Sequence, residues 1–399
     1  MLTQIELRHF KCFELLKLPL APLTLLAGAN ASGKSSVLQA LGLLHQTVKD
    51  AYWSDRLFLN GSVLRLGRAA DVIDQVHGRR TCSITLIDRG IGDPTGERAA
   101  EHEDDPDWAE DLLYAWRFSG EPTDRSLRIT GIRLDDDPEW QESHFHLERL
   151  MPSEMYYGTL PFRLEALSYL TAERLGPRDS YRVPDSEEHT EIGPAGENAA
   201  SLLETGRSTE VLRGLALPDV PPTRLPQVQA RMASFFPGCV LDVQQIPAAN
   251  VITLGIRTSD DTPFHRPVHT GFGLTQVLPV VVAALSAARD ALLLVENPEV
   301  HLHPAGQAQM GIFLAEVAAA GVQVLVESHS DHVLNGIRRA AKAGVLEPED
   351  AALHFFSPRS AEAPQVQTPT MSADGRLDFW PDGFFDQLDK DLSALAGWN

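Results

Sequence analysis

Residues 28–35 read Gly28-Ala29-Asn30-Ala31-Ser32-Gly33-Lys34-Ser35 and fit the pattern G-x-x-x-x-G-K-[S/T] at every fixed position. An apolar run from Leu23 to Ala27 precedes this loop and predicts a buried strand. Apolar residues at helical spacing follow it from Ser35 to Gln46. In the order strand, glycine loop and helix, backbone N–H groups curl around a phosphate, and the helix N-terminus adds partial positive charge. The stretch therefore predicts a nucleotide site.

The loop residues have separate expected roles. Lys34 is expected to reach the β- and γ-phosphates of ATP, and Ser35 to supply a ligand for Mg²⁺. The alternative, a chance glycine turn after a strand, is disfavoured by the flanking strand and helix. ATP and Mg²⁺ are therefore the predicted cofactors, and the expected nucleotide contacts in this region are Gly28, Asn30, Ala31, Ser32, Gly33, Lys34, Ser35 and Ser36.

Composition limits the class of protein. A chain of 399 residues with 43% apolar and 22% charged residues is typical of a soluble globular protein with one large domain or two or three smaller ones. No apolar run approaches the ~20 residues of a membrane span, and the N-terminus lacks the apolar core of a signal peptide. Cys12, Cys82 and Cys239 have neither disulfide-framework nor metal-ligand spacing, so we expect a cytoplasmic protein without a membrane partner.

The formal net charge of −21 argues against a wholly basic nucleic-acid-binding surface. It leaves room for a local basic patch, because net charge does not describe the distribution of charge. Acidic residues crowd the segment from Ile91 to Asp111, which predicts a solvated loop. A second acidic turn is expected from Arg133 to Pro138.

A second apolar run ends in acids. It reads Ala291-Leu292-Leu293-Leu294-Val295-Glu296-Asn297-Pro298-Glu299 and predicts a buried strand that presents carboxylates at its C-terminal end. In such an arrangement one acid orients Mg²⁺ and another polarises the attacking water. We predict Glu296 as the metal ligand and Glu299 as the general base. The alternative for this run in isolation is a core strand followed by solvated acids.

Two further segments have polar residues where a nucleotide site would use them. His329 follows the apolar run Val322 to Val326 and is expected to touch a γ-phosphate. A glycine pair precedes a helix predicted from Val277 to Leu285, with Pro279 in its first turn, and forms a second anion-binding geometry. The residues expected to contact nucleotide there are Gly271, Gly273, Thr275 and Gln276.

Two smaller groups of residues allow competing interpretations. His301 and His303 with Glu299 suggest a metal cluster, but no distant ligand pair of zinc spacing accompanies them, so zinc is disfavoured. Arg174 and Arg178 flank a Gly-Pro turn, where they serve either a phosphate or protein partner, or a surface ion-pair network with Glu173. The sequence alone leaves that second choice open.

Taken in order, these motifs resemble the ABC-type ATPases of the SMC, RecF and OLD group, often labelled AAA-family or AAA15-like ATPases in bacteria. The resemblance covers most of the chain and implies an α/β fold: a P-loop NTPase of ABC type with a mixed β-sheet flanked by helices and inserted α/β segments. It places Lys34 and Ser35 in Walker A, Glu296 and Glu299 in Walker B, and His329 as the switch histidine. Gly271 to Gln276 becomes the signature segment, which in this family binds the γ-phosphate held by the opposite protomer.

The chain departs from the family pattern at three points. The signature is not the usual Leu-Ser-Gly-Gly-Gln, Glu296 stands where Asp is usual, and Gln75 is the only glutamine we suggest for the Q-loop. The resemblance suggests an N-terminal ATPase part at 1–84, inserted segments at 85–265 and a C-terminal ATPase part at 266–399. Heptads are lacking between Walker A and signature, so we expect no coiled-coil arms. Because only a short segment of this sequence follows the last catalytic helix, we expect no Toprim nuclease domain in it.

The resemblance implies a function as well as a fold. We expect Mg·ATP binding and slow hydrolysis that clamp two protomers into a homodimer. The dimer would signal to a separate effector, such as a nuclease, in DNA repair or defence against foreign DNA. Direct contact with nucleic acid is expected to be weak. The alternatives are a non-hydrolysing, nucleotide-dependent scaffold and, less favoured, a P-loop phosphotransferase, in which the signature and His329 would have no role.

Overall fold

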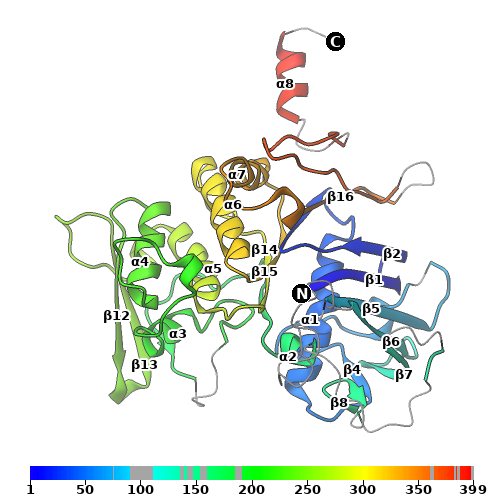
Figure 1. The fold of residues 1–399 in the computed structure, drawn as a ribbon. Coiled ribbons are helices and arrows are strands. Elements are labelled where there is room, and N and C mark those ends of the chain that lie inside the picture. Colours follow the sequence, from blue (N-terminus) through cyan, green and yellow to red (C-terminus); the bar gives the residue numbers. More distant parts are fainter. Residues whose placement is uncertain are drawn as a thin grey trace, which may run out of the picture. The chain divides into compact units, whose positions relative to one another are not determined.

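The computed structural model describes residues 1–74, 76–89, 111–134, 139–141, 147–152, 160–184, 191–359, 364–381, 383 and 387–396. The chain divides into two compact units. The first comprises Met1–Ala21 and Asn30–Leu167, and the second comprises Pro22–Ala29 and Ser168–Asn399. Figure 1 shows the elements of each unit. None of the helices in the described part of the chain is long and apolar enough to cross a bilayer.

The first unit is built on a six-stranded sheet in the order β2-β1-β5-β6-β7-β4, with every neighbouring pair antiparallel. Its strands are β1 (Leu2–Phe10), β2 (Phe13–Pro19), β4 (Arg56–Phe58), β5 (Thr81–Arg89), β6 (Asp111–Ser119) and β7 (Ser126–Leu134). Helix α1 (Lys34–Asp50) contacts β1, β4 and α2 (Leu160–Glu165). The short elements are η1 (Ala69–Asp71), β8 (Leu147–Glu148) and β9 (Met151–Pro152).

Four strands of this sheet, β2, β4, β6 and β7, are not predicted by the sequence patterns. From the sequence, the stretch from Lys11 to Pro22 is expected to be a connection between two strands, but it contains β2, in which Phe13, Leu16 and Leu18 are buried between exposed neighbours. Strands β6 and β7 were also missed. The predicted acidic loop falls mainly on 90–110, outside the described residues, and Asp111 at its end is the first residue of β6. The second acidic turn likewise falls mainly on 135–138, outside the described residues, although Arg133 and Leu134 belong to β7.

The second unit contains a six-stranded sheet in the order β10-β14-β15-β3-β16-β17. Strands β10 (Ser168–Leu170), β14 (Leu292–Glu296), β15 (Gln323–Glu327), β3 (Leu23–Gly28) and β16 (Ala351–Phe356) are parallel, and β17 (Val366–Gln367) is antiparallel to β16. The apolar runs predicted as β3, β14 and β15 are almost completely buried, as strands of a covered parallel sheet are. Because β14 and β15 pair Glu296 with Glu327, both acids lie at the same edge of the sheet.

Helices α5 (Phe272–Ser286), α6 (Pro304–Ala319) and α7 (Asp331–Lys342) pack with this sheet in one buried apolar core. A smaller sheet of β11 (Tyr181–Arg182), β13 (Val251–Arg257) and β12 (Val240–Ile246) lies with α3 (Ala199–Thr205) and α4 (Arg224–Phe235). The remaining elements are η2 (Arg213–Leu215), η3 (Pro247–Ala249), η4 (Pro267–His269), η5 (Pro348–Asp350) and α8 (Gln387–Ala396). The α/β class with a mixed sheet flanked by helices is thus confirmed.

The start of α5 differs from the prediction. The helix begins at Phe272 and not at Val277, so Pro279 lies inside it and not in its first turn. Gly196 accommodates the proline ring, since a Cβ on Gly196 would lie only 2.5 Å from Cβ of Pro279. Tertiary packing against a glycine therefore overrides the usual cost of an interior proline.

Candidate nucleotide-binding and catalytic residues

The glycine loop begins at the carboxyl end of β3, in the second unit. Gly28 has φ of 127°, and a Cβ at this position would lie 2.1 Å from the carbonyl oxygen of Phe356 on β16. The next residue, Ala29, donates its N–H to that same oxygen at 3.0 Å. A side chain at Gly28 is excluded both by the positive φ and by the close approach of β16, so the first fixed glycine of the pattern has a structural reason.

The rest of the loop belongs to the first unit and continues into α1. Ala31 has φ of 57° and Gly33 φ of 106°, and a Cβ on Gly33 would meet the Phe13 ring at 2.5 Å. Left-handed residues spaced in this way turn successive N–H groups toward a common anion. Lys34 and Ser32 are only 3% and 2% exposed, whereas Asn30 and Ala31 are exposed. Ser35 is half-buried and Ser36 is buried in the first turn of α1. This backbone conformation fits a phosphate group.

Glu296 ends β14 with both carboxylate oxygens engaged. The hydroxyl of Tyr169 on β10 donates to Oε1 at 2.5 Å, and the backbone N–H of Ala172 donates to Oε2 at 2.8 Å. Tyr169 is buried, and burial together with the neighbouring Glu296 raises its pKa well above the usual value, so the phenol stays a donor. These two contacts orient the carboxylate and leave each oxygen a further lone pair for an indirect metal contact.

The sequence left open whether Arg174 binds a phosphate or protein partner or forms an ion-pair network with Glu173, and its contacts show a third arrangement. Its guanidinium donates to the backbone oxygens of Glu296 at 2.7 Å and of Asn297 at 2.5 Å, and the residue is 7% exposed. Burial lowers its pKa to about 10, an effect that Glu299 and Glu296 oppose. Arg174 therefore fixes the backbone that follows β14, and it does not pair with Glu173.

Glu299 lies three residues after Glu296 in the chain, and a backbone hydrogen bond orients its carboxylate. Its Oε1 accepts the backbone N–H of His329 at 2.8 Å, which ties the loop after β14 to the end of β15. Burial raises the pKa of this carboxyl, although hydrogen bonds from the His329 backbone and the Ser328 side chain and the charge of Arg174 oppose the rise. A carboxylate oriented by a hydrogen bond, with a pKa moved toward neutral pH, has the properties required of a general base.

His329 lies next to an acid that the sequence analysis did not select. Its side chain is 38% exposed, and Nε2 lies 4.0 Å from Oε1 of Glu327, which is only 7% exposed. Glu327 is the last residue of β15 and pairs with Glu296 in register. The signal was present in the sequence, since Glu327 ends an apolar run in the same manner as Glu296.

Asn297, which directly follows Glu296, is a second residue to which the sequence patterns assigned no role. It has φ of 45°, a conformation that asparagine adopts more readily than most residues, and its backbone N–H donates to the backbone carbonyl oxygen of Glu327 at 2.8 Å. Its side-chain Oδ1 is buried without a hydrogen-bond partner among the described residues. A buried amide oxygen left in this way, directly after Glu296, is a candidate for orienting water.

The signature segment divides into an accessible and a buried part. Thr275 and Gln276 are buried, with Thr275 Oγ1 donating to the Phe272 oxygen at 2.8 Å and Gln276 Nε2 to the Leu175 oxygen at 3.4 Å. Gly273 allows close packing, because a Cβ there would lie 2.7 Å from the His301 oxygen. Gly271 is exposed at the N-cap of α5. The backbone N–H groups of this helix start are therefore better placed for an external anion than the side chains of Thr275 and Gln276.

The two histidines considered for zinc have other contacts. The ring of His301 lies 4.7 Å from that of Phe272, and Nδ1 of His303 accepts the N–H of Ala305 at the start of α6. Gln75, the suggested Q-loop residue, lies outside the described residues.

Comparison with known proteins assigns the chain to a family. A family model described as "AAA domain, putative AbiEii toxin, Type IV TA system" matches residues 23–335, and the chain belongs to that family. A model described as "Protein of unknown function (DUF3696)" matches residues 346–395. A curated relative, the OLD nuclease of Thermus scotoductus, is 24% identical over 349 residues, which are 83% of this chain and 59% of the relative. The chain thus spans less than two thirds of that relative's length.

Solved structures establish the fold. The Smc head bound to the C-terminal winged-helix domain of ScpA superposes with a TM-score of 0.53 at 14% identity, over 93% of this chain and 98% of the other. The Smc head with an extended coiled coil, bound to the C-terminal domain of ScpA from Pyrococcus furiosus, gives 0.52 at 12% identity, over 99% and 98%. The expected ABC-type P-loop NTPase fold, and the resemblance to the SMC and OLD group, are confirmed.

Proposed function

We propose that this chain binds Mg·ATP through the glycine loop and hydrolyses it with Glu299 as the general base. The observation that carries the proposal is the Glu299 carboxylate, oriented by the His329 N–H and shifted toward neutral pH by burial. The left-handed glycine loop supports the binding half of the proposal, because its backbone donors fit phosphate oxygens. Lys34 would add a point charge to the phosphates.

Ser35 and Glu296 are the residues that we propose for Mg²⁺. The hydroxyl and the carboxylate supply the oxygen ligands that this ion prefers, and the bound ion would neutralise charge on the phosphate oxygens. Tyr169 and Ala172 already bind the two carboxylate oxygens, so Glu296 is expected to act through water. His329 would contact the γ-phosphate, with Glu327 beside it.

We further propose an ATP-dependent homodimer in which the start of α5 faces the nucleotide of a second copy. Support comes from the accessibility of this segment. Gly271 is exposed, and Phe264, Val268 and Phe272 near it are 43%, 43% and 46% exposed. Apolar side chains exposed beside an anion-binding helix start are suited to burial against a partner surface.

The wider setting is proposed from the relatives. A separate effector such as a nuclease, acting in DNA repair or antiviral defence in the cytoplasm, fits a chain that is similar to part of an OLD nuclease. The Smc heads that it resembles were solved with domains of ScpA, a partner protein. Direct binding of nucleic acid by this chain alone is expected to be weak, because the net charge is −21.

Phosphate release and light scattering test the proposal together. The 399-residue chain with Mg·ATP is expected to release phosphate slowly, and a non-hydrolysable ATP analogue is expected to increase the dimer fraction. ATP-dependent dimerisation without phosphate release would favour the non-hydrolysing scaffold. Phosphate transfer to a second small molecule would favour the phosphotransferase. A persistent monomer at high concentrations of protein and analogue would contradict the dimer.

A further inference from the structure

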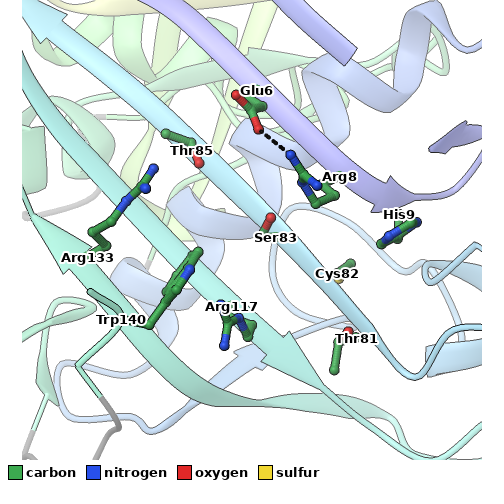
Figure 2. A pocket seen from close by; sticks show the side chains of 10 residues that line it. All are labelled: Glu6, Arg8, His9, Thr81, Cys82, Ser83, Thr85, Arg117, Arg133 and Trp140. Atoms are coloured by element: carbon green, nitrogen blue, oxygen red, sulfur yellow. Dashed lines mark ion pairs between the residues drawn. The ribbon is translucent and has the colours of Figure 1, made fainter. Parts of the chain in front are cut away.

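One face of the antiparallel sheet in the first unit carries a group of polar side chains that belongs neither to the glycine loop nor to the strand ends described above. Strand register places Arg8 opposite Ser83, Ser83 opposite Arg117, and Arg117 opposite Gly131. In the adjacent row, Thr85 lies opposite Ala115, which lies opposite Arg133. Residues directly opposite one another share a face of the sheet, so these two rows project together. Figure 2 shows the side chains around a common hollow.

The hollow has a volume of about 220 Å³. We call it the arginine pocket and define it by Arg8, Ser83, Thr85, Arg117, Arg133 and Trp140, which line it with four neighbours. This volume suits a phosphate group together with part of the molecule that carries it. It is too small for a whole nucleoside triphosphate.

Trp140 organises the pocket. The guanidinium carbon of Arg117 lies 4.1 Å from the centre of a Trp140 ring, and that of Arg133 lies 5.5 Å away. Both arginines are therefore held by cation–π contact with one side chain. Gly131 lets the indole lie close to the sheet, because a Cβ on Gly131 would be only 3.2 Å from Cε3 of Trp140.

Among the described residues that line the pocket, arginines outnumber acids. Among the described residues, neither Arg117 nor Arg133 makes an ion pair, and Nε of Arg133 is buried without a hydrogen-bond partner. Of the described lining residues, Glu6 is the acid, and its carboxylate lies 3.1 Å from Lys17 and 3.7 Å from Arg8. Half-buried guanidinium groups without an acid are costly unless an anion completes them. The imbalance is notable in a chain whose net charge is −21.

We propose that the arginine pocket binds a phosphate group, carried either by a small phosphorylated molecule or by a single-stranded polynucleotide. Arg117 and Arg133 would bind the phosphate oxygens, because the planar guanidinium matches them in paired hydrogen bonds. The hydroxyls of Ser83 and Thr85 supply neutral donors beside them. None of the residues that line this pocket belongs to the glycine loop, and the proposal goes beyond the proposed ATPase function.

Fluorescence of Trp140 tests the pocket directly. The full chain carrying Lys34→Ala, which is expected to weaken phosphate binding at the glycine loop, is titrated with inorganic pyrophosphate and with an oligothymidylate of about ten nucleotides. We expect a saturable change that Trp140→Phe removes. Arg117→Gln and Arg133→Gln should each weaken binding by about tenfold, since each removes a charge-assisted contact. Arg128→Gln is the matched control, because Arg128 lies exposed on the same strand as Arg133 and pairs with Asp55.

The two probes distinguish the source of the phosphate. Binding of pyrophosphate without binding of the oligonucleotide supports a small phosphorylated ligand, and binding of the oligonucleotide alone supports a polynucleotide. Gly131→Ala should weaken either ligand while the circular dichroism spectrum stays unchanged, because the added methyl group displaces Trp140. Affinity that is unchanged in the Arg117→Gln/Arg133→Gln double variant, or no binding of either probe at millimolar concentration, would overturn the proposal whatever the ATPase assay shows.

Discussion

Different kinds of contact hold two regions of the molecule in place: the glycine loop of residues 28–35 and an acidic cluster at the carboxyl ends of β14 and β15. The acidic cluster consists of Glu296, Glu299 and Glu327. The loop is shaped by backbone conformation and by steric exclusion, since a Cβ on Gly28 or Gly33 would overlap Phe356 or Phe13. The cluster is shaped by hydrogen bonds from side chains and backbone groups distant in the sequence, such as Tyr169 to Glu296. The loop should therefore tolerate few substitutions, whereas the cluster should tolerate isosteric ones that change its chemistry without changing its shape.

The largest effect is expected for Glu299→Gln, which keeps the shape of the side chain but removes its ability to accept a proton. Loss of a general base slows reactions by ~10²–10⁴, or roughly 3–5 kcal/mol of barrier. ATP affinity should barely change, and the ATP-bound dimer should accumulate. Glu173→Gln, which changes an exposed acid next to Arg174 in the sequence, is the control. Turnover measured by phosphate release checks both variants, and a wild-type rate in Glu299→Gln would remove Glu299 from the mechanism.

A smaller effect is expected for Tyr169→Phe, which breaks one of the two contacts that orient Glu296. A hydrogen bond to a charged group contributes about 1.5–3 kcal/mol, so the free energy of unfolding should fall by about that amount. If Glu296 serves the metal, a higher Mg²⁺ concentration should also be needed for half-maximal turnover. Chemical denaturation and a Mg²⁺ titration check the two outcomes. Unchanged Mg²⁺ dependence with lowered stability would assign the Tyr169–Glu296 contact to structure alone.

The pH profile gives the smallest and most specific change. The pKa of Glu299 is raised by burial, so the carboxyl becomes protonated at a higher pH than an ordinary glutamate, for which the pKa is ~4.3. A protonated carboxyl cannot accept a proton, and turnover should therefore fall as pH falls through this raised pKa. The acidic limb should be lost in Glu299→Gln. A limb at or below the ordinary glutamate value in the wild type would contradict the role of burial.

The difference between local backbone conformation in the glycine loop and long-range hydrogen bonds in the acidic cluster also explains which parts of the site could be predicted from the sequence. The Walker A motif could be predicted from the sequence because its glycines and its flanking strand and helix are adjacent in the chain and have fixed spacing. The strands β3, β14 and β15 could be predicted because a parallel strand that is buried on both faces of its sheet is a continuous apolar run. Glu327 and Asn297 were overlooked because their roles depend on the register of β14 with β15, which sequence spacing does not give.

Other features depended on tertiary contacts that no local pattern reports. Arg174 was ambiguous because its partners are backbone oxygens more than a hundred positions away. Strand β2 was missed because it follows β1 through a tight turn with positive φ at His9 and Lys11, where residue types usual for such turns are absent. The helix start at Phe272 was misplaced because the proline was assumed to need a first turn. The arginine pocket arises from four strands and Trp140, so it has no sequence motif.

Binding of ATP by the glycine loop is the central claim, and calorimetry of Lys34→Ala tests it most directly. Lys34 begins α1 and is 3% exposed, and we expect it to bind the phosphates. Loss of a charge-assisted contact of about 1.5–3 kcal/mol should weaken ATP by about 10- to 150-fold. Lys49→Ala, at the exposed end of the same helix, should bind as the wild type does. The account predicts weakened binding in Lys34→Ala alone, and ATP affinity equal to that of the wild type in this variant would contradict it.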